Sequence, residues 1–248
     1  MLPPRLHTEA TGSLSSVDRR LAADLCTMCQ PDGVSGRDDD DFLERVWEDR
    51  EERVYREVFG DLGRGIYPIP RADFERLGVT PDPRWLFVGA FECPPTTNRS
   101  SWLYVSSGLS NPWEQGTAAP SDFAGLGVEF VLESPTQSLW AARCVHWLAA
   151  LQLCARGDRA LDYGHRLNLH RPIDGLASAL SLVLIAYPRE PLPQQLSTLG
   201  GDVDLLYCIG ITESEREFAR RNGNEALVAE LAKHPGYPVT DPNRRSVV

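Results

Sequence analysis

The stretch VEFVLESPTQSLWAARCVHWLAALQLCA (residues 128–155) decides the fold class, because a strand pattern is followed directly by a helix pattern. Its first six residues alternate apolar side chains with others that include Glu129 and Glu133. This period of two predicts a strand with one buried face. From about Gln137 the apolar residues follow a helical period up to Ala155, and Thr136 is placed to act as the N-cap. This succession favours helices packed on a sheet.

The same two periods recur on both sides of this stretch. Helix patterns begin after capping residues and end at glycine or proline, and Thr212-Glu-Ser-Glu215 forms a capping box. Further strands are predicted at 85–91, 102–106, 163–169, 179–187 and 203–211, with one short strand in the tail 238–248. Further helices are predicted at 16–29, 42–59 with Gly60 as the C-cap, 72–77, 212–222 and 225–232.

The elements do not alternate as strictly as in a parallel βαβ protein. We therefore expect an α+β fold, with one mixed β-sheet and helices packed against it. Residues 1–14 are expected to form a flexible leader, and residues 15–83 an N-terminal helical segment packed on the main domain. Residues 84–248 are expected to be that main domain.

The chain is acidic, with a formal net charge of −10. Such a surface repels phosphate backbones and attracts basic proteins, so we expect a protein partner, basic in charge, and no nucleic acid. Only Lys233 among the 25 basic residues is a lysine, and this arginine bias indicates a GC-rich genome. No secretory h-region and no apolar run of membrane-spanning length are visible, which predicts a cytoplasmic protein without membrane contact.

A cysteine pair and an acidic run have the composition of metal ligands, but their contexts argue against a metal site. Cys26 and Cys29 have a two-residue spacing, but no second pair completes a zinc site, and they end a helix instead of starting one. The six cysteines are expected to be free thiols, with Cys144, Cys154 and Cys208 acting as small apolar residues. The acidic run 38–41 is interpreted as a helix N-terminus. We expect no metal, no cofactor and no catalytic residue.

The remaining candidates for chemistry are carboxylates and histidines. Glu129 and Glu133 share a strand face, so an enzyme that acts on a small molecule through Glu129, Glu133 and His165 is the alternative function. His146 lies on the apolar helix and is interpreted as a core histidine with a hydrogen-bond partner. Glu213, Glu215 and Glu217 are interpreted as solvated helix residues.

Several segments resemble the Suppressor of fused family in both order and spacing. Tyr104-Val-Ser-Ser-Gly-Leu-Ser110 and Gly125-Leu-Gly-Val-Glu-Phe130 are similar to two of its strand motifs. The other similar segments are Gly164 with His170-Arg-Pro-Ile-Asp174, the strand and helix Ile209–Glu217, Asn222-Gly223 with Leu227 and Leu231, and Asp241 with Arg244 and Arg245. Together they span about Trp85 to Val248.

This resemblance implies a Suppressor of fused N-terminal-domain-like fold and a protein-binding module that is not an enzyme. The animal protein of the family sequesters Gli transcription factors by adding a peptide strand to its own strands. Bacterial relatives are thought to include immunity proteins that neutralise toxins, and a sequestering regulator is the other reading. The chain ends where the animal protein's second lobe would begin, so a clamp between two lobes is not expected.

The resemblance also assigns roles to residues. The peptide-pairing strand corresponds to about Leu161–Leu169, which implies protein-binding positions at Leu161, Tyr163, His165 and Leu167. His165 stands where the animal protein has an acidic residue, so the charge match to the same peptide is lost. The other motif positions are expected to be structural: Gly108, Ser110, Gly127, Glu129, His170, Pro172, Asp174, Asn222, Gly223, Asp241 and Arg244.

Overall fold

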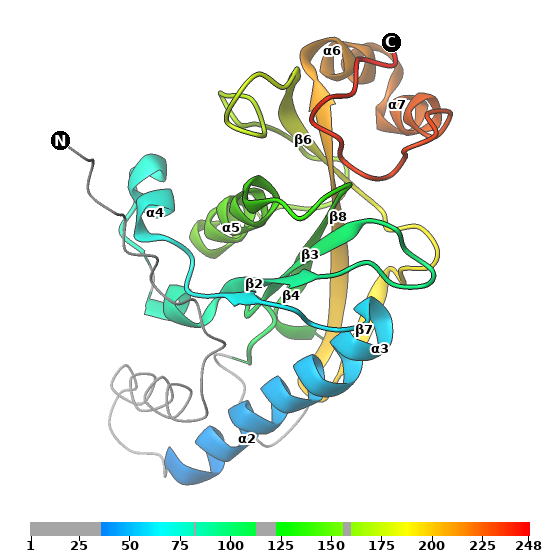
Figure 1. Ribbon diagram of the computed structural model, residues 1–248. Coiled ribbons are helices and arrows are strands. Elements are labelled where there is room, and N and C mark those ends of the chain that lie inside the picture. The colour runs from blue at the N-terminus through cyan, green and yellow to red at the C-terminus, as the bar shows by residue number, and fades with distance from the viewer. Residues whose placement is uncertain (1–35, 82, 113–122, 156–159) are drawn as a thin grey trace, which may run out of the picture.

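The computed structural model describes residues 36–81, 83–112, 123–155 and 160–248 (Figure 1). The helices are α2 (Gly36–Glu48), the π-helix η1 (Asp49–Tyr55), α3 (Arg56–Phe59), α4 (Arg71–Leu77), the 3-10 helix η2 (Pro83–Phe87), α5 (Leu139–Cys154), α6 (Glu213–Asn222) and α7 (Asn224–Leu231). The strands are β1 (Gly65–Ile66), β2 (Gly89–Cys93), β3 (Trp102–Ser107), β4 (Phe123–Ser134), β5 (Arg166–Asn168), β6 (Leu180–Ala186), β7 (Gln195–Thr198) and β8 (Gly201–Thr212).

The eight strands form one mixed sheet, in which seven follow the order β1-β2-β3-β4-β8-β6-β5 and β7 pairs with β8 off this path. The strands β4 and β8 run parallel, and every other pair is antiparallel. The long strand β8 pairs with β7 along its first residues and with β6 along its last ones. This sheet, with helices packed on it, confirms the predicted α+β class.

Helices cover both faces of the sheet (Figure 1). One core cluster joins α4 and α5 to alternate residues of the strands, such as Phe130 and Leu132 of β4. A second cluster joins η1, α3, α6 and α7 to the other residues, such as Val131. The prediction that β4 has one buried face was therefore wrong, because Glu129 and Glu133 also lie in the interior.

The run α2–η1–α3 is one continuous helical segment, as predicted for residues 42–59. It begins at Gly36, so the acidic run 38–41 falls in its first turns, and it ends at Gly60, whose φ is 84°. The π-helical turn within it was not predicted. The Asp49 carboxylate accepts a hydrogen bond from the Leu199 amide at 2.7 Å, so this segment lies against the end of β7.

Four details of the predicted elements were wrong. Residues 85–87, predicted to begin a strand, belong to η2 instead. The ring of Trp85 packs on that of Phe74 with the two ring centroids 5.8 Å apart. The helix α5 has Ser138 as its N-cap, with no side-chain cap from Thr136. The strands β1 and β7 were missed, since their two and four residues are too short for a periodic pattern.

The tail also differs from its prediction, because residues 238–248 contain no strand. The Arg244 side chain holds this tail in place by bonding Glu215 and the Gly210 carbonyl, so the tail packs on α6 and β8 without joining the sheet. The predicted helix 16–29, with Cys26 and Cys29, lies outside the described residues.

Candidate functional site

The strand β5 forms one edge of the sheet and is bonded only to β6 among the described strands. The Leu169 amide donates to Ser181 O at 3.0 Å, and His165 O accepts from the Ile185 amide at 2.9 Å. Because partners alternate along an antiparallel pair, the backbone groups of Arg166 and Asn168 point away from β6. This edge therefore offers two outward N–H groups and two outward carbonyls.

The structure places the four implied binding residues in different surroundings. Leu161 is buried in the core, and its amide donates to Gln152 Oε1 at 2.8 Å. Tyr163 is half-buried and lies in a turn, while His165 is exposed. Leu167 is half-buried and packs on the core cluster beneath α5.

The predicted strand 163–169 is consequently shorter in the structure. Gly164 has φ of 84°, a left-handed turn conformation, and the regular strand starts two residues later. The Gly164 carbonyl accepts a hydrogen bond from Asn224 Nδ2 at 2.7 Å, which ties this turn to α7. Only His165 of the four implied residues is therefore a freely accessible side chain.

A cleft lies at each end of β5. The cleft at its start has a volume of about 570 Å³ and lies between the end of β6 and α7. Tyr163 and Tyr187 stack there with ring centroids 3.8 Å apart, and the Tyr163 hydroxyl donates to Leu205 O at 3.0 Å. The exposed half of Tyr187 gives this cleft an apolar wall.

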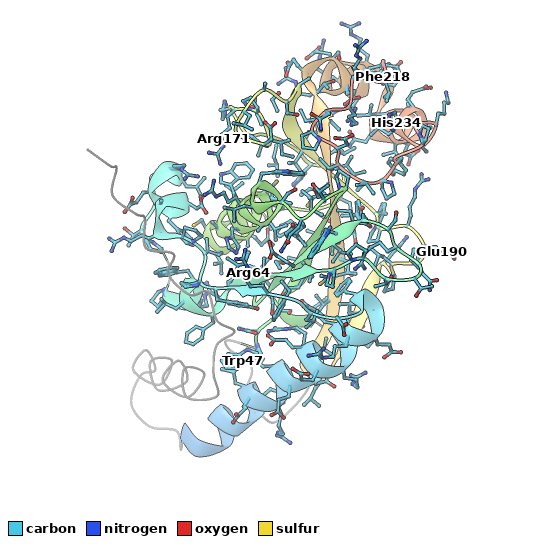
Figure 2. All side chains as sticks on the ribbon, viewed as in Figure 1. Trp47, Arg64, Arg171, Glu190, Phe218 and His234 are labelled. Atoms are coloured by element: carbon cyan, nitrogen blue, oxygen red, sulfur yellow. The ribbon has the colours of Figure 1, made fainter. Side chains whose placement is uncertain are left out.

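The cleft at the other end has a volume of about 500 Å³. Figure 2 labels Arg171, which lies on the β5–β6 loop beside α5. Sequence reasoning missed this cleft, although one signal was available. Trp140, Arg143, Cys144 and Trp147 are spaced as i, i+3, i+4 and i+7, which puts them on one face of α5.

The carboxylate of Glu129 is buried and fully engaged by the fold. It accepts hydrogen bonds from the hydroxyls of Ser106 (2.5 Å) and Ser110 (2.6 Å), and from the amides of Gly108 and Ser110 (both 3.0 Å). Arg50, also buried, donates to Ser110 Oγ at 3.2 Å and to Asn111 Oδ1 at 2.7 Å. The network joins η1 to the loop after β3.

The residues of the alternative enzyme site do not converge. Glu133 is buried and accepts hydrogen bonds from Ser101 Oγ and from the Tyr207 hydroxyl, the latter at 3.0 Å. His165 lies at the edge strand, and β8 and β6 separate it from β4, which carries both glutamates. The structure therefore contradicts a shared site for Glu129, Glu133 and His165.

The described cysteines and His146 show no arrangement for metal binding or catalysis. The described part of the chain contains no group of three or more metal-ligating side chains. Cys93, Cys144, Cys154 and Cys208 are free thiols, and burial raises the pKa of Cys144 to about 12. His146 is buried with a ring nitrogen 3.0 Å from Ile66 O, as a core histidine should be. No helix in the described ranges is long and apolar enough to cross a bilayer.

A family model described as Suppressor of fused protein (SUFU) matches residues 86–245, more than half of the chain. This chain belongs to the Suppressor of fused family. The match confirms the resemblance carried by the sequence motifs and covers nearly the same residues. A search of the curated protein sequences finds no match.

Solved structures of Suppressor of fused proteins share the fold. A homologue from Neisseria gonorrhoeae, described as a putative Suppressor of fused protein, has a TM-score of 0.56 and 23% identity, covering 84% of this chain and 97% of that one. A chain of the Sufu–Fu complex has a TM-score of 0.52 and 19% identity, and the match covers 73% of this chain and 93% of that one. Drosophila Suppressor of Fused has a TM-score of 0.52 and 19% identity. The match covers 64% of this chain, which spans only 42% of the Drosophila chain.

The Suppressor of fused motif around β3 and β4 builds a tight loop. Gly108 has φ of 117°, and a Cβ there would lie 2.3 Å from Phe87 O, so only glycine fits. Ser110 supplies two of the bonds to Glu129. Gly127 lies within β4, two residues before that glutamate. Gly108 and Ser110 thus shape the loop that follows β3.

The loop between β5 and β6 contains the motif residues 170–174. Asp174 accepts hydrogen bonds from the amides of Leu176 (2.9 Å) and Ser178 (3.3 Å), which shapes the loop. His170 is exposed and has φ of 55°, and its amide donates to Asn168 Oδ1 at 2.7 Å. Pro172 is half-buried between them. This loop forms one wall of the 500 Å³ cleft.

The last motif residues hold α6, α7 and the tail together. Asn222 and Gly223 end α6, and the Asn222 side chain donates to Phe218 O at 3.0 Å. The interpretation of Glu215 as solvated was wrong, because it is buried and paired with both Arg244 nitrogens at 2.6 and 2.8 Å. Asp241 accepts the Asn243 amide at 2.9 Å in the turn before that arginine.

Proposed function

We propose that this protein is a non-catalytic protein-binding module that adds a segment of its partner to the edge strand β5. The observation that carries the proposal is the outward row of backbone groups at Arg166 and Asn168, with a cleft at each end. Membership of the Suppressor of fused family supports it, and so does the solved Sufu–Fu complex, in which a family member is bound to another protein. Strand addition supplies main-chain bonds, and side-chain pockets supply selectivity.

β5 is better suited to strand addition than the other outer strands. The turn after β7 is held by η1, whose Asp49 carboxylate accepts a hydrogen bond from the Leu199 amide. β1 has only two residues. We propose that residues 84–248 form the binding domain and that the helical segment 15–83 packs on it.

The proposed partner is a basic protein, and the proposed role in the cytoplasm is that of an immunity protein that neutralises a toxin or of a regulator that sequesters its partner. The net charge of −10 supports a basic partner such as a nuclease toxin, whose own surface must attract nucleic acid. Attraction between such surfaces raises the association rate and weakens with salt. The product of the adjacent gene is the first partner to test.

A pull-down with that neighbouring gene product tests the role. We expect a complex at low salt whose association slows as salt is raised. No complex at low salt would reject the immunity role while leaving strand addition open.

A substitution in β5 tests the binding edge itself. Asn168→Pro removes an outward N–H, whereas the amides of Leu167 and Leu169 still face β6. We expect this variant to lose most of the partner affinity while its far-ultraviolet circular dichroism is unchanged. Asn168→Ala is the control, since it removes only the side-chain bond to the His170 amide and keeps the N–H. Equal affinities for Asn168→Pro and Asn168→Ala would place the partner elsewhere.

A further inference from the structure

The cleft at the end of β5 is walled by three elements that are distant in sequence. α4 contributes Arg76, α5 contributes Arg143 with two tryptophans, and the β5–β6 loop contributes Arg171. Asn168 and Leu169 also line it, so the outward edge of β5 opens directly into the cleft. A chain paired to β5 would therefore continue into this space.

The charge of the cleft is opposite to that of the whole molecule. Three arginines line it against a single lining carboxylate, Asp174, in a chain with a net charge of −10. Asp174 is engaged by two backbone amides of its own loop. Arg76 pairs with Asp73 at 2.7 Å. A local reversal of sign in an acidic protein favours an anionic ligand group at this place.

Two of the arginines keep their guanidinium groups accessible. Arg143 and Arg171 are exposed, and no described carboxylate lies within ion-pair distance of either. Both are near enough to Asp73 to act on its carboxylate. A guanidinium has five N–H donors arranged for a carboxylate, so these two side chains can bind an incoming anion without breaking an existing pair.

The walls between the arginines are apolar. Trp140 and Trp147 lie two turns apart on α5 and are half-buried, whereas Cys144 and Ile173, which also line the cleft, are buried. Tryptophan and arginine are the residues that most often dominate the energy of protein interfaces. The cleft thus combines a charged rim with a floor that suits an apolar side chain.

We propose that this cleft binds an acidic side chain, Asp or Glu beside an apolar residue, in the partner segment that pairs with β5. The inference deepens the proposed function and rests on it. The partner as a whole is basic, but the segment that it adds carries a carboxylate at one end. Arg143 and Arg171 bind the carboxylate, and Trp140 and Trp147 contact the neighbouring apolar side chain.

The test is a selection of random dodecapeptides displayed on phage against the full chain. We expect the selected peptides to be enriched in Asp or Glu next to a large apolar residue, at one end of a β-branched run. The Arg143→Glu/Arg171→Glu variant should lose that enrichment and should bind the best wild-type peptide at least tenfold more weakly, measured by fluorescence anisotropy. Arg143→Gln/Arg171→Gln should give the same loss without adding negative charge.

Arg221→Glu/Arg245→Glu is the matched control, since both side chains are exposed, lie on α6 and in the tail, and change the net charge equally. It should keep the acidic preference. Equal weakening by both charge reversals, no acidic enrichment, or equal binding by a short oligothymidylate would overturn the proposal.

Repeating the selection with Asn168→Pro separates the proposed cleft from the proposed edge strand. Loss of the β-branched run alone would reject neither the cleft nor the edge, whereas an unchanged run would reject strand addition and leave the cleft standing.

Discussion

At the scale of single residues, two arginines of the described chain lie in the interior, and composition does not distinguish them from the others. Arg50 bonds the loop that surrounds Glu129, and Arg244 pairs with Glu215 across 29 residues of sequence. Burial alone would raise the pKa of Glu215, but hydrogen bonds from Arg244 and from the Thr212 amide hold it below the ordinary value. Both glutamates are therefore part of the structural core.

Replacing Arg244 with methionine should destabilise the protein by about 3–5 kcal/mol, because it leaves a buried carboxylate without its partner. Unfolding in urea measures this loss, with the exposed Arg245→Met as a control that should change stability by less than about 0.5 kcal/mol. Since the folded pKa of Glu215 is depressed, its contribution is present above the pKa of the unfolded carboxyl and is lost as pH falls through the folded value. The gap between wild type and Arg244→Met should therefore narrow in acid, and a constant gap would contradict the ion pair.

His146 predicts a second pH dependence. Burial lowers its pKa from 6.5 to about 4, even though the bond to Ile66 O opposes the shift. The folded state keeps the ring neutral, so stability is full above about pH 6.5 and falls by about 3 kcal/mol as pH drops toward 4. Comparing His146→Gln with wild type by urea unfolding at pH 7 and pH 4.5 measures this. The variant should lose less stability on acidification, and equal losses would refute the assignment.

Single residues were predictable from sequence where local pattern decides their surroundings. His146 was correctly interpreted as a core histidine because it lies on a helix of nearly continuous apolar residues. Glu215 was not, since its partner Arg244 comes from the tail and no local period connects the two. Glu129 was noticed as part of a motif, but Arg50, which bonds the loop around it, lies outside the segment that the motifs cover.

At the scale of elements, the capping box that begins α6 is complete. Thr212 Oγ1 accepts the Glu215 amide at 3.2 Å, and Glu215 Oε2 accepts the Thr212 amide at 2.8 Å. Thr136, predicted to cap α5, contacts only Ser138 Oγ and caps no backbone amide of that helix. Two threonines with similar sequence signals thus have different roles.

This difference gives a direct prediction. Thr212→Ala should lower the free energy of unfolding by about 1–2 kcal/mol because α6 loses an N-cap bond. Thr136→Ala should change it by less than about 0.5 kcal/mol because the hydroxyl is exposed and caps nothing. Thermal or urea unfolding of the two variants provides the comparison. Equal effects would mean that the sequence assignment for Thr136 was right after all.

The long elements could be predicted because their periods extend over many residues. β4, β8, α5 and α6 were located within a few residues of their bounds. The short strands β1 and β7 and the π-helical turn η1 could not be found, since two to seven residues do not establish a period. β5 was expected to be longer, because only the backbone conformation at Gly164 shows where its pairing becomes regular.

At the scale of the whole molecule, η1 and α3 share one core cluster with the sheet, and Arg50 adds buried hydrogen bonds between η1 and the loop after β3. We therefore expect one cooperative unit. Native-state hydrogen exchange should give the amides of α3 protection close to that of β4, while those of the short helix α4 exchange faster. Rapid exchange in α3 with slow exchange in β4 would show that the segment opens by itself.

The order of the strands could not be predicted from sequence. The parallel pair β4 and β8 is separated by more than sixty residues, and nothing in either pattern identifies the other as its neighbour. The candidate edge was located by family resemblance, whereas the arginine cleft required α4, α5 and the β5–β6 loop to be seen together. Both depend on long-range packing that periodicity does not encode.

The brevity of β5 limits what its backbone can contribute to affinity. Two outward residues offer at most four main-chain bonds, each with a net value of about 0.5–1.5 kcal/mol. A micromolar complex needs about 8 kcal/mol, after the cost of immobilising the incoming chain is met. Pairing with this edge would therefore mainly fix the distance between the two ligand side chains that enter the clefts at the ends of β5. Any two ligands that span the same distance should compete, however different the residues between their ends.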